Sequence, residues 1–440
     1  MLPTAASHRN RPTVLLGAAL VLAILLPGSA SARHAAAHPH QRSVVAHKVG
    51  WAGITAQSTL AATPYMGWDT YYALGGHSSE ATVLSQASQL VSLGLQRRGY
   101  RYVWLDVGWW HGTRNAVGQI TVSPTQWPHG MAWLTRTLHA AGLLVGLYTD
   151  AGPNGCGGAG EGSYGHYQQD ANTFAAWGFD AVKVDFCGGA EYQLNPAAAY
   201  GAFHAAIAAN ASHRPMLLSI CDFLQPEQYG EGRPTIDQSA FASYSFGPSI
   251  ANSWRTDTDV GLPGNVSFTN VLRNMDADAA APQATGPGHW NDPDYLAPDQ
   301  GMSATQFASQ LSMWAILAAP LMISDDLTRI SRASLQAVQN TEVIAIDQDP
   351  GGVQGTLLSS SGNAQVWVKP TIDGSRAVAL LNRGSSATGI ETSASAVGLP
   401  GASSYRILNV WTHTSSSSRG SIAAEVPGEG TVLLRVSAAG

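Results

Sequence analysis

Carboxylates recur at the ends of short apolar runs in this chain. In four consecutive units such a run finishes in or beside an aspartate, at Asp106, Asp150, Asp185 and Asp222. One such aspartate is explained as a helix N-cap, a position that Asp favours, but N-capping does not readily account for four in succession. Carboxyl groups that converge can act as nucleophile, general acid or general base. The pattern therefore indicates a site built from carboxylates at strand ends.

A lysine and a tyrosine share the faces of two of these carboxylates. Side chains alternate along a strand, so residues two apart point the same way. Lys183 therefore lies on the face of Asp185, where its cation should keep the carboxylate ionised. Tyr148 lies on the face of Asp150 in the same way. Aromatic faces stack on sugar rings while carboxylates and cations bind hydroxyls, so this combination favours a sugar ligand.

Several tryptophans lie near these positions and are further candidates for sugar stacking. They are Trp68, Trp109, Trp110, Trp254 and Trp290. Because most tryptophans in proteins are largely buried, we expect about half of these to pack in the core instead.

Hydrolysis of a glycoside requires a second carboxyl group. The segment "NSWRTDTDV" (252–260) offers Asp257 and Asp259 beside Arg255. The residues alone do not choose between the two aspartates. A metal site at this D-x-D is disfavoured because the further Asp, Asn and Gly spacing of a calcium loop is missing. We therefore expect no metal ion and no other cofactor.

The elements that would position these groups alternate from about residue 61 to 350. Amphipathic stretches that end near a glycine separate the apolar runs, of which the clearest are 100–110, 142–150, 180–187 and 215–221. This alternation predicts a parallel sheet covered by helices. A span close to 290 residues suits a (β/α)8 TIM barrel, in which catalytic groups lie at the C-terminal ends of strands. A doubly wound sheet is the alternative, but no G-x-G-x-x-G follows the first strand.

The hydrophobic pattern of the sequence changes after about residue 350. Apolar and polar residues alternate with a period near two, and Asp373-Gly374 marks a turn. Residues 351–440 are therefore predicted to form a C-terminal antiparallel β-sandwich. Such a domain could bind carbohydrate, but a structural cap on the barrel is the simpler interpretation.

The N-terminus reads as a secretion signal. Arg9 and Arg11 precede an apolar run at 14–26, and Ala30-Ser31-Ala32 offers a cleavage site. We expect a cleaved signal peptide at 1–32 rather than a membrane anchor, because the run is too short to span, and a disordered lead-in at 33–60. The mature protein is then extracellular and free of the membrane. Its net charge of −6 argues against a nucleic-acid partner.

Export makes disulfides possible, and the chain has three cysteines. A bond between Cys156 and Cys187 would close a loop of about 30 residues and contribute roughly 3–4 kcal/mol of stability. Cys221 would then remain unpaired. A three-cysteine metal site is disfavoured because no CxxC spacing is present.

The ordered motifs of the chain resemble those of the secreted α-galactosidases and α-N-acetylgalactosaminidases of glycoside hydrolase family 27. "TPYMGWDTYY" resembles T-P-x-M-G-W, "GYRYVWLDVGWW" resembles G-Y-x-Y-x-x-x-D-D-x-W, "FAAWGFDAVKVDFC" resembles F-A-x-W-G-x-D-x-x-K-x-D-x-C, and "SWRTDTDV" resembles W-R-x-x-x-D-I. The resemblance runs from about Thr63 to the C-terminus. It implies a (β/α)8 barrel with an antiparallel β domain, and hydrolysis of terminal α-galactosides with retention through a covalent intermediate.

The resemblance also assigns roles. It implies that Asp185 is the nucleophile and Asp259 the acid/base, with Asp257 at a variable position. It implies a disulfide between Cys156 and Cys187 beside the site. Sugar contacts are expected from Trp68, Tyr71, Asp106, Tyr148, Lys183, Asp222, Arg255 and Asp294.

Departures from the family pattern concern the sugar. The resemblance implies that the family's D-D pair, whose second aspartate is Val107 here, binds the 4- and 6-hydroxyls of the sugar. One acceptor is therefore missing, and an unpaired buried hydroxyl costs roughly 1–3 kcal/mol. Tyr71 replaces a tryptophan, Asp222 a glutamate and Tyr295 a methionine. A related specificity is therefore the alternative to α-galactoside: β-L-arabinopyranoside, α-N-acetylgalactosaminide or an isomalto-dextranase-like activity. A non-catalytic sugar-binding protein is disfavoured by the presence of both carboxylates, and a metal-dependent hydrolase by the lack of metal-ligand spacing.

Overall fold

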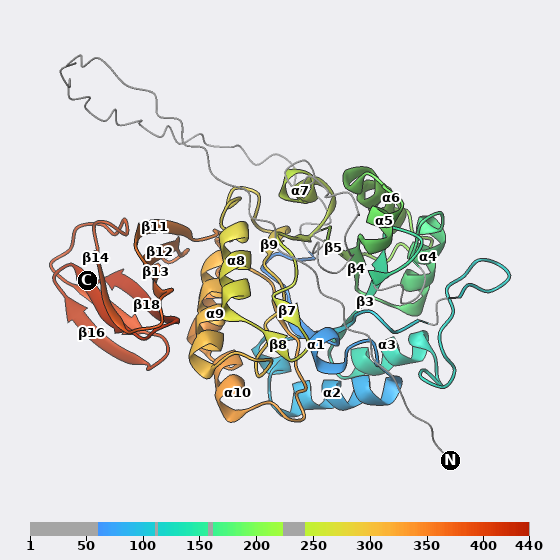
Figure 1. Cartoon of the computed structure of the whole chain (residues 1–440), viewed down its shortest axis with the longest axis horizontal. Coiled ribbons are helices and arrows are strands. Elements are labelled where there is room, and N and C mark those ends of the chain that lie inside the picture. The colour runs from blue at the N-terminus through green and yellow to red at the C-terminus, as the bar shows by residue number, and fades with distance from the viewer. Residues whose placement is uncertain (1–59, 111–112, 157–161, 223–242, 440) are drawn as a thin grey trace, which may run out of the picture. The chain divides into compact units, whose positions relative to one another are not determined.

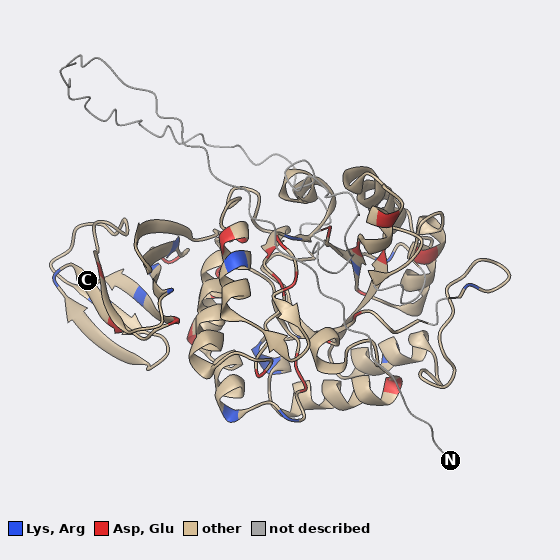
Figure 2. Cartoon of the chain, in the orientation of Figure 1, with Lys and Arg blue, Asp and Glu red and all other residues tan. Residues whose placement is uncertain are grey.

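The computed structural model describes residues 60–110, 113–156, 162–222 and 243–439. The expected signal peptide and nearly all of the expected lead-in lie outside these ranges. No helix in the described ranges is long and apolar enough to cross a membrane. Figure 2 shows Lys and Arg scattered among Asp and Glu over these ranges, as expected for a chain of which 12% is charged.

An eight-stranded parallel sheet forms the larger part of the structure, in the order β10-β1-β2-β3-β4-β5-β6-β9. A bridge between Leu296, just after β9, and Ile323 in β10 connects the two ends of this order, which confirms the TIM barrel. All strand residues are buried except Leu144 at the start of β3, because a parallel sheet is covered on both faces. The strands are β1 (Met66–Asp69), β2 (Tyr102–Leu105), β3 (Leu144–Asp150), β4 (Ala181–Asp185), β5 (Leu217–Ile220), β6 (Ser253–Arg255), β9 (Trp290–Asp292) and β10 (Leu321–Ile323).

Helices surround these strands (Figure 1), and local sequence sets their ends. The Ser79 side chain accepts a hydrogen bond from the Thr82 N–H at the start of α2, and Ser303 caps α9 in the same way with Gln306. Gly178 ends α4 in the left-handed conformation, with φ of 92°. The helices are α1 (Tyr71–Leu74), α2 (Glu80–Ser92), α3 (Met131–Ala140), α4 (Tyr167–Trp177), α5 (Cys187–Glu191), α6 (Pro196–Ala208), α7 (Gly247–Ile250), α8 (Phe268–Asp278), α9 (Ala304–Leu317), α10 (Arg332–Val338) and α11 (Thr341–Asp347).

A second, antiparallel domain follows and confirms the predicted β-sandwich. Six strands form one sheet in the order β11-β12-β13-β18-β15-β16, and β14 pairs with β17. This domain has its own core, which includes Val378, Leu380, Ile422 and Val436. The strands of the sandwich are β11 (Thr356–Ser361), β12 (Ala364–Pro370), β13 (Arg376–Asn382), β14 (Thr388–Ser393), β15 (Tyr405–Asn409), β16 (Thr414–Ser418), β17 (Ser421–Val426) and β18 (Gly430–Ala438). A separate small hairpin, β7 (Gly261–Leu262) with β8 (Asn265–Val266), lies earlier in the chain, between β6 and α8.

Polar contacts join the β-sandwich to the barrel. Arg383 pairs with Asp276 at the end of α8 through two bonds of 2.7 and 2.8 Å. The ammonium of Lys369, on β12, is fully buried and donates to the Ala315 carbonyl of α9 at 2.9 Å. These contacts fit the interpretation of the sandwich as a structural cap.

Candidate active site

Charged side chains gather at the C-terminal ends of the barrel strands. Because the strands are parallel, these ends lie on one face of the barrel. The groups brought to this face are Asp69 (β1), Asp106 (after β2), Asp150 (β3), Asp185 (β4), Asp222 (after β5), Arg255 (β6) and Asp292 (β9). The carboxylates that recur along the sequence are therefore neighbours in space.

Lys183 lies between two of these carboxylates. Its Nζ is 2.8 Å from Asp106 Oδ2 and 3.6 Å from Asp185 Oδ1. Burial opposes the charge of this lysine, but the attraction of Asp106 and Asp185 outweighs it and raises the pKa of Lys183 well above its usual value. The site therefore holds a permanent cation next to Asp185.

Asp185 itself is buried at the end of β4. Burial raises its pKa to about 6, because desolvation disfavours the carboxylate, and the Lys183 cation lowers the pKa only in part. The sequence-based expectation that Lys183 keeps this group ionised has the right sign but neglects the larger effect of burial. At neutral pH Asp185 is nevertheless mostly ionised.

A second cation, Arg255, holds two other carboxylates. Its Nη2 is 2.7 Å from Asp259 Oδ1 and its Nη1 is 2.9 Å from Asp294 Oδ1. Arg255 is 1% exposed, whereas the side chain of Asp259 is 28% exposed. Asp259 is thus oriented by a buried guanidinium while part of its carboxyl group stays open.

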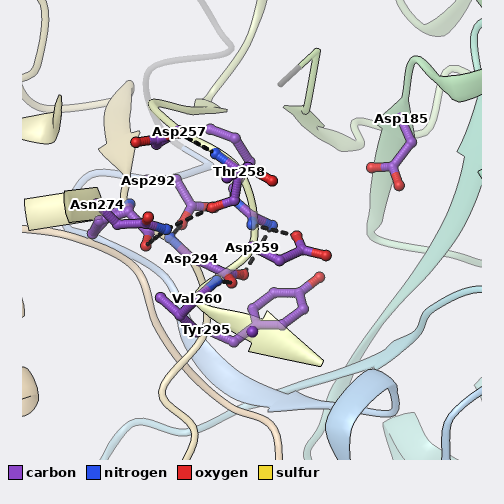
Figure 3. Close-up of polar contacts among 12 residues, drawn as sticks. Asp185, Asp257, Thr258, Asp259, Val260, Asn274, Asp292, Asp294 and Tyr295 are labelled. Carbon is purple, nitrogen blue, oxygen red and sulfur yellow. Dashed lines mark hydrogen bonds and ion pairs between the residues drawn. The ribbon is translucent and has the colours of Figure 1, made fainter. Parts of the chain in front are cut away.

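Asp257 and Asp259 point in different directions. Asp257 accepts a hydrogen bond from the Thr258 N–H at 2.7 Å and lies 3.4 Å from Arg273. Figure 3 shows the Asp257 carboxyl turned away from Asp185, while the carboxyl groups of Asp259 and Asp185 point toward one another. Of the two candidates that the residues alone left open, Asp259 is therefore the one that faces Asp185.

Asp294 has a strained backbone that serves this arrangement. Its φ is 89°, in the left-handed region that favours glycine. The conformation is held because Asp294 Oδ2 accepts from the Val260 N–H at 2.7 Å and from the Tyr72 hydroxyl at 3.2 Å. Burial raises the pKa of Asp294 to about 7 against the effect of Arg255.

Tyr295 is a site residue that was expected only as a departure from the family pattern. Its hydroxyl donates to Asp106 Oδ2 at 2.9 Å. Its ring centroid lies 5.2 Å from Lys183 Nζ and 5.7 Å from the Arg255 guanidinium carbon, which is within reach of a cation–π interaction. The left-handed φ of the preceding Asp294 directs the Tyr295 side chain toward Asp106. No periodicity in the sequence predicts this placement.

Asp222 lies near the end of β5 and has one side-chain partner among the described residues. Ser243 donates a hydrogen bond to Asp222 Oδ1. The other oxygen, Oδ2, is buried and has no hydrogen-bond partner within those ranges. Burial raises the pKa of this carboxyl to about 7.

The predicted sugar contact by Trp68 is wrong. Trp68 has no exposed surface, and its indole N–H donates to the Asp325 carbonyl at 2.7 Å. Tyr148 also has almost no exposed surface, because Trp110 stacks on its ring at a centroid distance of 5.3 Å. Tyr71, in contrast, is only partly buried.

Cys156 and Cys187 form the disulfide that the resemblance implied, with a Cα–Cα distance of 5.0 Å. The bond ties the loop after β3 to the start of α5, two residues past Asp185, and Cys156 Sγ lies 3.3 Å from Asp185 Oδ2. Asp150 Oδ1 joins the same segments by accepting from the N–H groups of Gly152 and Gly189. The nucleophile candidate therefore lies in a covalently braced corner of the barrel.

Asp150, Cys156 and Cys187 bring their polar atoms within 4.8 Å of one another. The two sulfurs are bonded to each other, so neither is a thiolate that could bind a metal ion. Cys221 is buried and unpaired, which leaves no three-cysteine cluster among the described residues.

Comparisons with known proteins agree with this geometry. The family described as alpha galactosidase A matches residues 76–349, and the alpha galactosidase C-terminal beta sandwich domain matches residues 361–436. A probable alpha-galactosidase of Dictyostelium discoideum is 36% identical over 360 residues, which are 81% of this chain and 86% of that protein.

Two solved structures extend the comparison. Alpha-galactosidase I from Mortierella vinacea superposes with a TM-score of 0.75 at 27% identity, covering 87% of this chain and 99% of that one. A β-L-arabinopyranosidase from Geobacillus stearothermophilus superposes with a TM-score of 0.74 over 87% and 98% of the two chains, but at 18% identity it shows the fold alone.

Proposed function

This chain belongs to the alpha-galactosidase (melibiase) family and is a glycoside hydrolase, and from that premise we propose that it is a secreted, retaining exo-glycosidase. It removes terminal α-galactosyl residues or a closely related sugar from an oligosaccharide or polysaccharide by double displacement. A disulfide in the chain supports an oxidising, extracellular location.

The single observation that carries this proposal is the opposed pair Asp185 and Asp259 (Figure 3). Each carboxyl group has its own buried cation, Lys183 for Asp185 and Arg255 for Asp259. Two carboxyl groups facing one another across a sugar are what a retaining hydrolase requires, at a separation of roughly 5–5.5 Å.

The two carboxyl groups then divide the reaction. Asp185, which is mostly ionised at neutral pH, attacks the anomeric carbon while Asp259 gives its proton to the departing glycosidic oxygen. The covalent glycosyl ester on Asp185 is next cleaved by water, from which Asp259 removes a proton. The free sugar leaves with its original anomeric configuration, and both carboxyl groups return to their starting states.

The remaining polar groups are assigned to sugar recognition. Lys183 with Asp106 and Arg255 with Asp294 form two ion pairs whose groups can exchange partners with hydroxyls. Asp222, whose Oδ2 is buried without a hydrogen-bond partner among the described residues, completes the set from the side of β5.

A second candidate specificity is β-L-arabinopyranoside. L-Arabinopyranose has the ring configuration of galactose but lacks the hydroxymethyl group, and Val107 supplies no acceptor for the hydroxyl of that group. The α-N-acetylgalactosaminide and α-glucoside specificities are further outcomes to be tested.

The experiment is incubation with aryl glycosides of these four sugars, with the released phenol and the first-formed sugar anomer both recorded. Release of the phenol with retention supports the proposal. Inversion contradicts the mechanism. Binding of a sugar without release from any glycoside contradicts the enzymatic function.

A further inference from the structure

Asp106 has few lone-pair sites left for a sugar, because neighbouring groups already donate to both of its carboxyl oxygens. Its Oδ2 accepts from Lys183 Nζ at 2.8 Å and from the Tyr295 hydroxyl at 2.9 Å. Its Oδ1 accepts from the Val107 N–H at 2.7 Å. A carboxylate has about four lone-pair sites, so contacts within the described residues leave Asp106 about one for a sugar hydroxyl.

Neighbouring groups do not replace the missing acceptors. Val107 has an aliphatic side chain and accepts nothing. Asp69 lies on the adjacent strand, but it has no exposed surface, and its Oδ1 already accepts from the Tyr71 N–H at 2.7 Å. Burial and the nearby Asp106 also raise the pKa of Asp69 well above its usual value.

Resting on the proposed function, we propose that Tyr295 is a specificity-determining residue that makes the site favour terminal pyranoses without a hydroxymethyl group at C5. By occupying Asp106 Oδ2, the Tyr295 hydroxyl leaves this side of the site able to bind one sugar hydroxyl and not two. A pentopyranose such as a β-L-arabinopyranoside presents only its C4 hydroxyl there. An α-D-galactoside presents the C4 and C6 hydroxyls, and one of them remains unpaired at a cost.

The position of Tyr295 is well determined by its surroundings. The cations of Lys183 and Arg255 lie over its ring, and the Tyr72 ring meets it edge-on at a centroid distance of 6.4 Å. Its backbone follows the left-handed Asp294, which Arg255 and Val260 hold in place. In Figure 3 the ring extends toward the space between Asp259 and Asp185. The hydroxyl is therefore a fixed part of the binding surface.

The test compares β-L-arabinopyranoside with α-D-galactoside carrying the same aryl leaving group, since the two sugars differ only in the hydroxymethyl group. We expect wild type to prefer the arabinopyranoside by about tenfold or more in kcat/KM. Tyr295→Phe keeps the ring and frees Asp106 Oδ2, so the preference should fall by about tenfold. Adding Val107→Asp to Tyr295→Phe should shift the ratio of the two kcat/KM values further toward the galactoside.

Tyr65→Phe is the matched control. The hydroxyl of this buried tyrosine forms a hydrogen bond with the Ser253 hydroxyl at 2.9 Å, near the N-terminal ends of the strands. Removing it should leave the sugar preference unchanged. Calorimetric binding of free L-arabinose and D-galactose to wild type and Tyr295→Phe gives a second readout that needs no turnover. A preference that is the same in both proteins, by rate or by binding, overturns the role of Tyr295. If wild type cleaves none of the glycosides while Tyr295→Phe still shifts the binding ratio, the proposed hydrolysis fails and the specificity role stands.

Discussion

Arg255 and Asp259 form an ion pair in which Nη2 and Oδ1 are 2.7 Å apart, and this contact turns Asp259 toward Asp185 (Figure 3). Asp257, two residues earlier, lies 3.4 Å from Arg273 instead. Two aspartates of one short loop therefore have different surroundings, and they make a matched pair for mutation.

Asp259→Asn should reduce kcat by about 10²–10⁴-fold, because the departing oxygen loses its proton donor. The loss should be smallest for aryl glycosides whose phenol is most acidic, since such a leaving group needs little protonation. Asp257→Asn should leave kcat within about threefold of wild type. Equal losses in the two variants, with unchanged folding by circular dichroism, would contradict the assignment.

The pH dependence of kcat/KM should have an acidic limb near pH 6. The pKa of Asp185 is raised to about 6, so the group is protonated, and unable to attack, below that pH. Activity should fall about tenfold per pH unit there. Lys183 lowers this pKa, so Lys183→Met should move the limb upward by about 1–3 units. A limb at pH 4 in both proteins would show that Asp185 is not the titrating group.

The disulfide should matter for both stability and turnover. Cys156 and Cys187 are 31 residues apart, so replacing both with serine should lower the free energy of unfolding by roughly 3–4 kcal/mol in the chain-entropy model. Turnover should also fall, because the bond braces the segment after Asp185. Denaturant titration measures the first effect. Cys221→Ala, which leaves the bond intact, is the control, and an equal loss in that variant would count against the account.

Two buried titratable residues, Lys369 and Asp347, lie near one another where the β-sandwich meets the barrel, and Lys369 Nζ donates to the Asp347 backbone carbonyl at 3.4 Å. Lys369 and Asp347 are both buried; burial lowers the pKa of Lys369 and raises that of Asp347, and each partner opposes the shift of the other. Replacing both, as Lys369→Met with Asp347→Leu, should leave stability unchanged or raise it by about 1–4 kcal/mol. Lys369→Met alone should destabilise by about 1–3 kcal/mol, because the Ala315 carbonyl loses its donor and the buried Asp347 carboxyl loses the nearby cation. Thermal unfolding compares the variants, and a double variant less stable than the single one would contradict this reasoning.

The fold followed closely from sequence, because buried strands and a two-residue period are direct consequences of which faces are covered. The gathering of the carboxylates at strand ends could be predicted equally well, since a parallel barrel brings those ends together. Trp68 shows the limit of this reasoning. Alternation predicts that it lies in the first strand, but it does not predict that its side chain is fully buried with its indole N–H bound to the Asp325 carbonyl.

Orientation within loops was the other limit. The spacing of Asp257 and Asp259 does not tell which of them pairs with Arg255; in the structure Asp259 does, while Asp257 accepts from the Thr258 N–H. Tyr295 reaches Asp106 only through the left-handed backbone of Asp294. The pKa of Asp185 depends on burial by the whole barrel mouth, which the adjacent Lys183 in the sequence does not reveal.

The most direct test of the account is to trap the covalent intermediate. The enzyme is incubated with a 5-fluoro glycosyl fluoride of the sugar it accepts, digested, and its peptides are sequenced by mass spectrometry. The account predicts one glycosyl adduct, on Asp185, and none in Asp185→Asn. An adduct on a different carboxyl group, or rapid turnover of the reagent's parent glycoside with inversion and no adduct, would contradict it.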